Sequence, residues 1–285
     1  MKYLIDHDYH IHTQISQCSS DPEQTPERIL EYARKKGLKR VVITDHFWDE
    51  NVPGASNWYD TYHKFSNISA ALPLPEDESV KLLFGCETDM DKHGVIGISV
   101  ERYNDFDFII VATTHMHMKS FTVEDEDYCN AERLARLWVD RFDTLLNADL
   151  PFHKVGVAHL TTACIAVEGN LHYEVLDLIP ESEMTRLFTK AAELGLGVEL
   201  NGSDFYVTDE YIESVIRPYR IAKACGCKFY LGSDAHKPRE FSAFNNLSRV
   251  IDMLRLTEDD KFYIPSNIKH TPRVRCENYV MPHDA

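Results

Sequence analysis

Histidines and carboxylates two residues apart are the groups in this sequence best suited to hold metal ions. His10 and His12 form one such pair near the start of the chain, and Asp234 and His236 form another towards its end. On an extended strand, side chains two positions apart project from the same face. Imidazole and carboxylate donors together suit Zn²⁺, Mn²⁺ or Fe²⁺, whereas Ca²⁺ prefers oxygen donors alone. Both pairs are therefore candidate metal ligands.

Further potential ligands follow other short apolar runs. These runs predict strands over residues 3–9, 39–44, 80–86, 106–113, 154–158, 196–200 and 228–232. At or just beyond their ends come His46, Glu87, His115, His159 and Asn201. A glutamate among histidines can bridge two cations with its two oxygens. Potential ligands at the ends of most predicted strands are poorly explained as separate packing residues. The pattern favours one metal site that they share.

Amphipathic segments alternate with these runs, as in a parallel α/β architecture. Thr25 and Pro26 offer an N-cap and a first-turn proline, and Gly37 follows the last turn of that helix. Further helices are expected over 130–147, 182–195 and 241–256. We predict a single domain over 1–285, a distorted (β/α)7 TIM-like barrel to about residue 260 with an irregular tail, 261–285. The carboxyl ends of the strands of such a barrel share one face, where the ligands would converge.

Composition narrows the possible partners and the compartment. The 285 residues carry a formal charge of −16 and no local basic run, which disfavours nucleic acid as a partner. The first ten residues lack the apolar core of a signal peptide, and no uninterrupted apolar stretch is long enough to span a membrane. Seven cysteines without framework spacing fit a reducing compartment. We expect a cytoplasmic protein, with its oligomeric state left open.

Four segments in order resemble the polymerase and histidinol phosphatase (PHP) superfamily, in particular its histidinol phosphatase-like phosphoesterases. They are HIHT at 10–13, TDH at 44–46, GCE at 85–87 and GSDAH at 232–236. The resemblance implies a distorted seven-stranded barrel that binds two or three divalent transition-metal ions, Zn, Mn or Fe. It assigns His10, His12, Glu87 and Asp234 to the first ion; Glu87 as a bridge, His115 and His159 to the second; His46 and His236 to the third. Asp45 would orient its neighbours.

The sequence departs from this family pattern at one ligand. Relatives with a full third site often carry a histidine six residues after the second His of HxH, where this chain has Cys18. Either Cys18 or the nearby Asp21 could complete the third site, or the site could be partly empty. A loop cysteine without a role is an equally acceptable interpretation.

Other residues are candidates for contacts with a substrate. Lys237 and Arg239 follow the last motif and could neutralise a phosphate, since a guanidinium binds phosphate in bidentate fashion. Lys237 and Arg239 could instead be solvated loop charges. Asn201 and Trp48 could line the pocket. His117 could protonate a leaving group or could equally be a loop histidine. Trp58 is expected in the core.

These features predict a phosphoric monoester hydrolase. A metal-bridging hydroxide would attack a small phosphorylated metabolite, histidinol phosphate being one candidate, with Glu87 and Asp234 as catalytic carboxylates. Three alternatives remain. An amidohydrolase-like C–N hydrolase also uses HxH, but often has a modified lysine where this chain has His115. A nuclease-type phosphodiesterase would need a basic track. A non-catalytic metal-binding domain is disfavoured by the near-complete ligand set.

Overall fold

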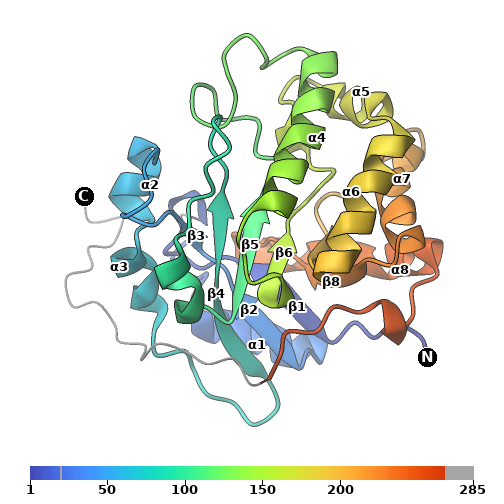
Figure 1. Ribbon diagram of the computed structural model, residues 1–285. Coiled ribbons are helices and arrows are strands. Elements are labelled where there is room, and N and C mark those ends of the chain that lie inside the picture. Colours follow the sequence, from blue (N-terminus) through green and yellow to red (C-terminus); the bar gives the residue numbers. More distant parts are fainter. Residues whose placement is uncertain (20, 267–285) are drawn as a thin grey trace.

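Parallel strands form a nearly closed barrel in the computed structural model, which describes residues 1–19 and 21–266 (Figure 1). Neighbouring strands follow the order β1-β2-β4-β5-β6-β7-β8, and the short β3 pairs with β4. The (β/α)7 prediction is confirmed. The strands are β1 (His7–Ile11), β2 (Arg40–Ile43), β3 (His46–Phe47), β4 (Lys81–Asp89), β5 (Phe108–Ala112), β6 (Val155–Val157), β7 (Gly197–Asn201) and β8 (Lys228–Gly232).

The barrel closes between β1 and the segment that follows β8. The backbone N–H of Asp234 donates to the carbonyl of His10 at 2.8 Å, and the N–H of His12 donates to the carbonyl of Ala235 at 3.2 Å. The seam is therefore made by the residues that carry the first and last ligand pairs. Strand pairing and ligand placement depend on the same few peptide groups.

Alternate residues of the strands serve two cores. On β5, Phe108 and Ile110 face the barrel interior, whereas Ile109 and Val111 pack against the surrounding helices. Strands buried on both faces read as continuous apolar runs, which made them visible in the sequence. Phe262 and Ile264 join the interior cluster with 5% and 3% of their surface exposed. The first residues of the predicted irregular tail, 261–285, therefore pack into the barrel without forming a helix or strand, and its residues 267–285 lie outside the described part of the chain.

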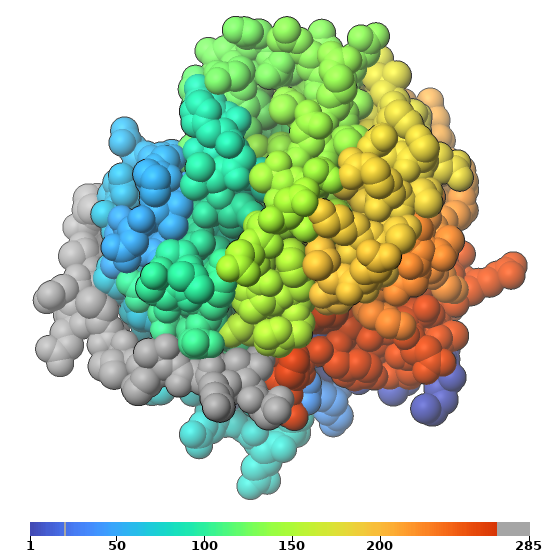
Figure 2. Space-filling view, in the orientation of Figure 1, coloured from blue at the N-terminus to red at the C-terminus, as the bar shows by residue number. Residues whose placement is uncertain are grey.

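Helices cover the outside of the barrel, and α4 and α6 lie side by side on its surface (Figure 2). The first helix begins and ends as predicted, with Thr25 accepting from the N–H of Arg28 and Gly37 in the left-handed region at φ 71°. The α-helices are α1 (Pro26–Lys36), α2 (Asn57–Tyr62), α3 (Phe65–Ile68), α4 (Ala131–Asn147), α5 (Leu171–Leu178), α6 (Glu181–Leu194), α7 (Ile212–Ala224) and α8 (Leu247–Leu254).

One helix prediction was wrong. The segment expected as one helix over 241–256 is a 3-10 helix, η6 (Pro238–Asn246), followed by α8. The other 3-10 helices are η1 (Gln17–Ser19), η2 (Ser69–Ala71), η3 (Val100–Asp105), η4 (Phe152–Lys154), η5 (Ala163–Ile165) and η7 (Glu258–Asp260). Among the described residues, none of the helices is both long and apolar enough to cross a bilayer.

Candidate metal centre

Four side chains meet at the carboxyl ends of β1, β4 and β8. The Nε2 atoms of His10 and His12 lie 3.1 Å apart. Each lies 3.4 Å from Glu87 Oε2, and they lie 3.4 and 3.2 Å, respectively, from Asp234 Oδ1. Donors that share one ion at a bond length of 2.0–2.1 Å are about 2.8 to 3.4 Å apart in octahedral or tetrahedral geometry. The spacing of these atoms therefore fits a single cation between them.

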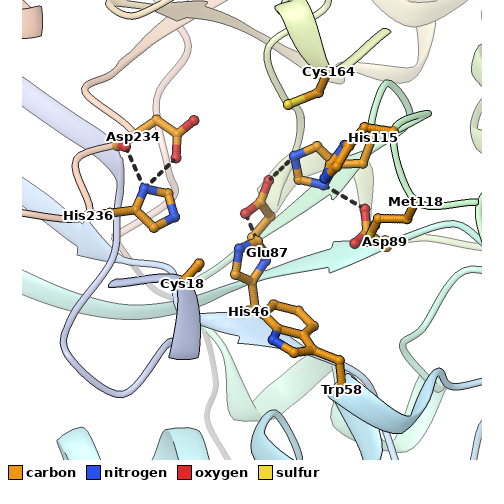
Figure 3. Close-up of a pocket in the computed structure, with 11 residues that line it drawn as sticks. Cys18, His46, Trp58, Glu87, Asp89, His115, Met118, Cys164, Asp234 and His236 are labelled. Atoms are coloured by element: carbon orange, nitrogen blue, oxygen red, sulfur yellow. Dashed lines mark hydrogen bonds and ion pairs between the residues drawn. The ribbon is translucent and has the colours of Figure 1, made fainter. Parts of the chain in front are cut away.

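Glu87 lies in the middle of the pocket and presents its two oxygens to different histidines (Figure 3). Its Oε1 lies 2.9 Å from His159 Nε2 and 4.0 Å from His115 Nε2. These three residues form a second group able to hold an ion. Glu87 Oε2 is buried and accepts no hydrogen bond from the residues that the structure describes. An orphaned buried carboxylate oxygen facing several imidazoles is expected where a cation binds.

A third group consists of His12, His46 and His236. His46 Nδ1 lies 3.1 Å from Glu87 Oε2 and is buried without a hydrogen-bond partner among the described residues. Cys18 lines the same pocket as His46 and His236. Asp21 does not line it: its Oδ1 accepts from the N–H of Glu23 within a turn. Of the two residues predicted to complete this group, the structure brings only Cys18 to the pocket.

Hydrogen bonds behind the histidines orient the ring nitrogens towards the pocket. His10 Nδ1 donates to Glu199 Oε1 at 2.8 Å. His12 Nδ1 donates to Ser16 Oγ at 3.3 Å, and that hydroxyl donates in turn to Asp45 Oδ1 at 2.7 Å. Partners of this kind select the tautomer whose Nε2 lone pair is free to bind a metal. Asp45 therefore has the orienting role that the sequence predicted for it.

The residues behind His115 and His159 escaped the sequence analysis. His115 Nδ1 donates to Asp89 Oδ1 at 2.9 Å, and Asp89 Oδ2 accepts from the hydroxyl of Tyr59. His159 Nδ1 donates to Thr114 Oγ1 at 3.0 Å. Asp89 had a detectable signal, because it lies two residues after Glu87 on the same strand. The predicted strand ends at residue 86, whereas β4 continues to Asp89.

Burial and charge have opposite effects on the ionisation of these groups. Burial alone would lower the pKa of His12, but its contacts with Asp234 and Glu87 outweigh burial and raise the pKa to about 9. Burial would likewise raise the pKa of Glu87, but His10 and His46 hold it well below its usual range. Protons and metal ions therefore compete for the same cluster of ionised carboxylates and imidazoles.

Two candidate ligands have unusual backbone conformations, and one glycine allows a close approach of side chains behind the pocket. His159 and Asp234 have positive φ angles of 28° and 52°, an uncommon conformation that is concentrated at functional sites. At Gly232, an added Cβ would lie 1.9 Å from Glu199 Oε1 and 2.7 Å from the Cβ of His10. Glycine at this position therefore lets Glu199 reach His10.

A family model described as the PHP domain matches residues 8–203, more than half of the chain. The chain belongs to the PHP family. That match includes the candidate ligands from His10 to His159, whereas the GSDAH segment lies beyond it.

Curated proteins similar to this PHP chain carry the name probable phosphatase. One from Caldicellulosiruptor bescii is 27% identical over 74% of this chain and 72% of its own length. One from Aliivibrio fischeri is 25% identical over 85% of this chain and 80% of its own length. A crystal structure of a histidinol phosphate phosphatase from Lactococcus lactis, complexed with zinc, L-histidinol and phosphate, superposes with a TM-score of 0.55. It covers 90% of this chain and 95% of that chain at 18% identity, so it supports the fold alone.

The substrate contacts predicted for this PHP chain need correction at two aromatic residues. Trp48 does not wall the pocket: it is 1% exposed, and its indole N–H donates to the carbonyl of Val52. It fills the space above Gly97, where an added Cβ would lie 2.4 Å from its ring. Trp58, expected in the core, lines the pocket instead. The short helix α2 carries it there.

Of the predicted polar contacts, only His117 lies on the pocket. Arg239 has 78% of its side chain exposed, and neither it nor Lys237 is among the described lining residues. Asn201 is fully buried, and its Nδ2 donates to Asp234 Oδ2 at 3.2 Å, so it orients a ligand. Burial lowers the pKa of His117 to about 4, which leaves it uncharged at neutral pH and unsuited as a standing proton donor.

Proposed function

We propose that this chain hydrolyses phosphoric monoesters of small metabolites with two or three divalent transition-metal ions. The observation that carries the proposal is the 3.1–3.4 Å spacing of donor atoms from His10, His12, Glu87 and Asp234. Membership of the PHP family and relatives named probable phosphatases support a metal-dependent phosphatase rather than a C–N hydrolase. His115 lies where such C–N hydrolases often carry a modified lysine, which supports the same choice.

The three groups of donors support three ion positions. We assign His10, His12, Glu87 and Asp234 to the first ion, and Glu87, His115 and His159 to the second. His46, His236 and Cys18 would hold the third. Bound ions at such positions supply Lewis-acid charge to phosphoryl oxygens and lower the pKa of water.

The remaining polar residues support binding and orientation rather than proton transfer. Glu199, Ser16, Asp89 and Thr114 fix the tautomers of four imidazoles, so that these present their lone pairs without reorganisation. The four are His10, His12, His115 and His159. His117 can hydrogen-bond to a substrate as a neutral imidazole, because its Nδ1 has no partner among the described residues. Water is then the proton source for the leaving alcohol.

The physiological setting is also a proposal. A net charge of −16 disfavours a polyanionic substrate such as DNA, and the six cysteines within the described part of the chain are free thiols, as in a reducing cytoplasm. Histidinol phosphate remains one candidate among small phosphomonoesters.

Replacing Glu87 by Gln tests the proposal. The purified wild type should contain at least two transition-metal ions per chain and hydrolyse a generic aryl phosphate. Chelation should stop turnover, and Mn²⁺ or Zn²⁺ should restore it. Glu87→Gln should lower both metal content and rate, because its two oxygens serve two ions. Glu193→Gln, an exposed change of equal charge on α6, serves as control. Hydrolysis of amides without any phosphatase activity would refute the assignment.

A further inference from the structure

The outer wall of the metal pocket is built mainly from side chains without formal charge. Beyond the candidate ligands, Trp58 of α2, Met118 after β5 and Cys164 of η5 line a cavity of about 390 Å³. Trp58 and Cys164 lie on opposite sides of Glu87 (Figure 3). The volume is at the small end for sites that bind small molecules. A substrate held by its phosphate at the ions would therefore place its leaving group against this wall.

Within residues 1–19 and 21–266, neither lysine nor arginine lines this pocket. Two nearby cations contact residues outside the pocket: Lys119 Nζ lies 4.5 Å from the centre of the Tyr128 ring, and the exposed Arg239 lies 4.0 Å from Glu240. Asp89 adds a further carboxylate to the wall. A second anionic group on the substrate would find no counter-charge among these residues and would be repelled by the acidic surface.

Trp58 is held in position by other rings before any substrate arrives. Its ring centre lies 3.9 Å from that of His63 and 5.2 Å from that of His46. His63 is fully buried, and neither of its ring nitrogens has a hydrogen-bond partner among the described residues, so packing places it behind Trp58. A ring fixed in this way offers a stacking surface at little cost in conformational entropy.

We infer that the site selects phosphomonoesters whose leaving group is a flat, apolar alcohol without a second anionic group. Trp58 is then the specificity-determining residue. The inference rests on the proposed phosphatase activity and narrows its substrate class. His117, which also lines the pocket, can supply a polar contact to such an alcohol.

Three matched esters test the inference in the holoenzyme. Benzyl phosphate has a flat leaving group, cyclohexylmethyl phosphate has a puckered one of similar size, and 4-carboxybenzyl phosphate adds an anion. All three leaving groups are primary alcohols, so chemical reactivity differs little. We expect kcat/KM for the benzyl ester to exceed that for the cyclohexylmethyl ester about 2- to 13-fold, the ratio that one aromatic contact supports. The carboxylated ester should be at least about tenfold poorer than the benzyl ester, since its anion is left unpaired.

Variants of Trp58 test whether this side chain causes the preference for the benzyl ester. Trp58→Ala should bring the benzyl-to-cyclohexylmethyl ratio close to one, mainly through KM, whereas Trp58→Phe should retain most of it. Tyr206→Ala, which removes a 63% exposed ring outside the pocket, should change nothing. Binding of the uncleavable 4-nitrobenzylphosphonate provides a readout independent of turnover. It should quench tryptophan fluorescence in the wild type but not in Trp58→Phe, because Trp48 and Trp138 are each 1% exposed.

The outcomes separate the two proposals. Turnover of all three esters at equal kcat/KM, or an unchanged ratio in Trp58→Ala, would overturn the inference and leave the phosphatase assignment intact. If Trp58→Ala does not fold, the ratio in Trp58→Phe and the fluorescence measurement decide in its place. Absence of turnover with every ester, in metal-loaded protein, would overturn the proposed function and the inference together.

Discussion

Replacing Glu199 by Gln should weaken metal binding although Glu199 is not itself a proposed ligand. Its two oxygens accept different hydrogen bonds, from His10 Nδ1 at 2.8 Å and from the backbone N–H of His159 at 2.7 Å. A glutamine has one acceptor oxygen and one NH₂ donor in the same space. One of the two buried donors would then face another donor, which costs about 1–3 kcal/mol.

The Glu199→Gln change should lower metal affinity through its effect on His10. A neutral amide orients the imidazole less firmly than a carboxylate does, and loss of such a partner commonly weakens metal affinity about 10- to 100-fold. This corresponds to about 1.4–2.7 kcal/mol of binding free energy. We expect the ion held by His10 and Asp234 to show the loss.

Competition with a chromogenic chelator measures this affinity, and urea unfolding in excess chelator measures the stability of the metal-free protein. Glu193→Gln, on the exposed face of α6, is the control for lost charge and should match the wild type. Metal affinity of Glu199→Gln within twofold of the wild type would refute the orienting role. A drop in metal-free stability alone would assign Glu199 to packing.

Three further predictions address single residues. Cys18→Ala should lose one bound ion per chain, whereas Asp21→Asn should retain all of them, since only Cys18 lines the pocket; elemental analysis that gave the reverse would exchange their roles. Gly232→Ala should lower metal affinity at least about tenfold in the chelator competition, because its Cβ would displace the carboxylate that orients His10. Burial alone would raise the pKa of Asp6, but hydrogen bonds from His7 and Lys261 lower this pKa to about 2. The ionised Asp6 therefore stabilises the fold above about pH 4, and this contribution is lost as the pH falls towards 2. Its side chain is 35% exposed, so we expect Asp6→Asn to cost only about 1 kcal/mol at pH 7 by urea unfolding, and an equal cost at pH 3 would contradict this cause.

Features that depend on the local alternation of side chains could be predicted from the sequence. Features that depend on contacts between distant parts of the chain could not. The pairs at 10 and 12 and at 234 and 236 could be placed because alternation along a strand fixes which side chains share a face. The predicted locations of Trp48 and Trp58 were both wrong. Only the tertiary fold shows that Trp48 fills the space over Gly97 and that α2 brings Trp58 to the pocket. Arg239 was misplaced for a related reason, because its direction depends on how η6 leaves the barrel.

The closure of the barrel next to the ligands also sets the order in which a newly made chain can acquire its ions. Ser233 donates a hydrogen bond to the carbonyl of His10 across 223 residues of sequence. At a synthesis rate of 5–20 residues per second, that distance takes about 11–45 s to translate. The group of Glu87, His115 and His159 is complete well before Asp234 and His236 emerge. The residues of the proposed second site are therefore all synthesised early, whereas the proposed first and third sites can be complete only after the last strand has docked beside the first.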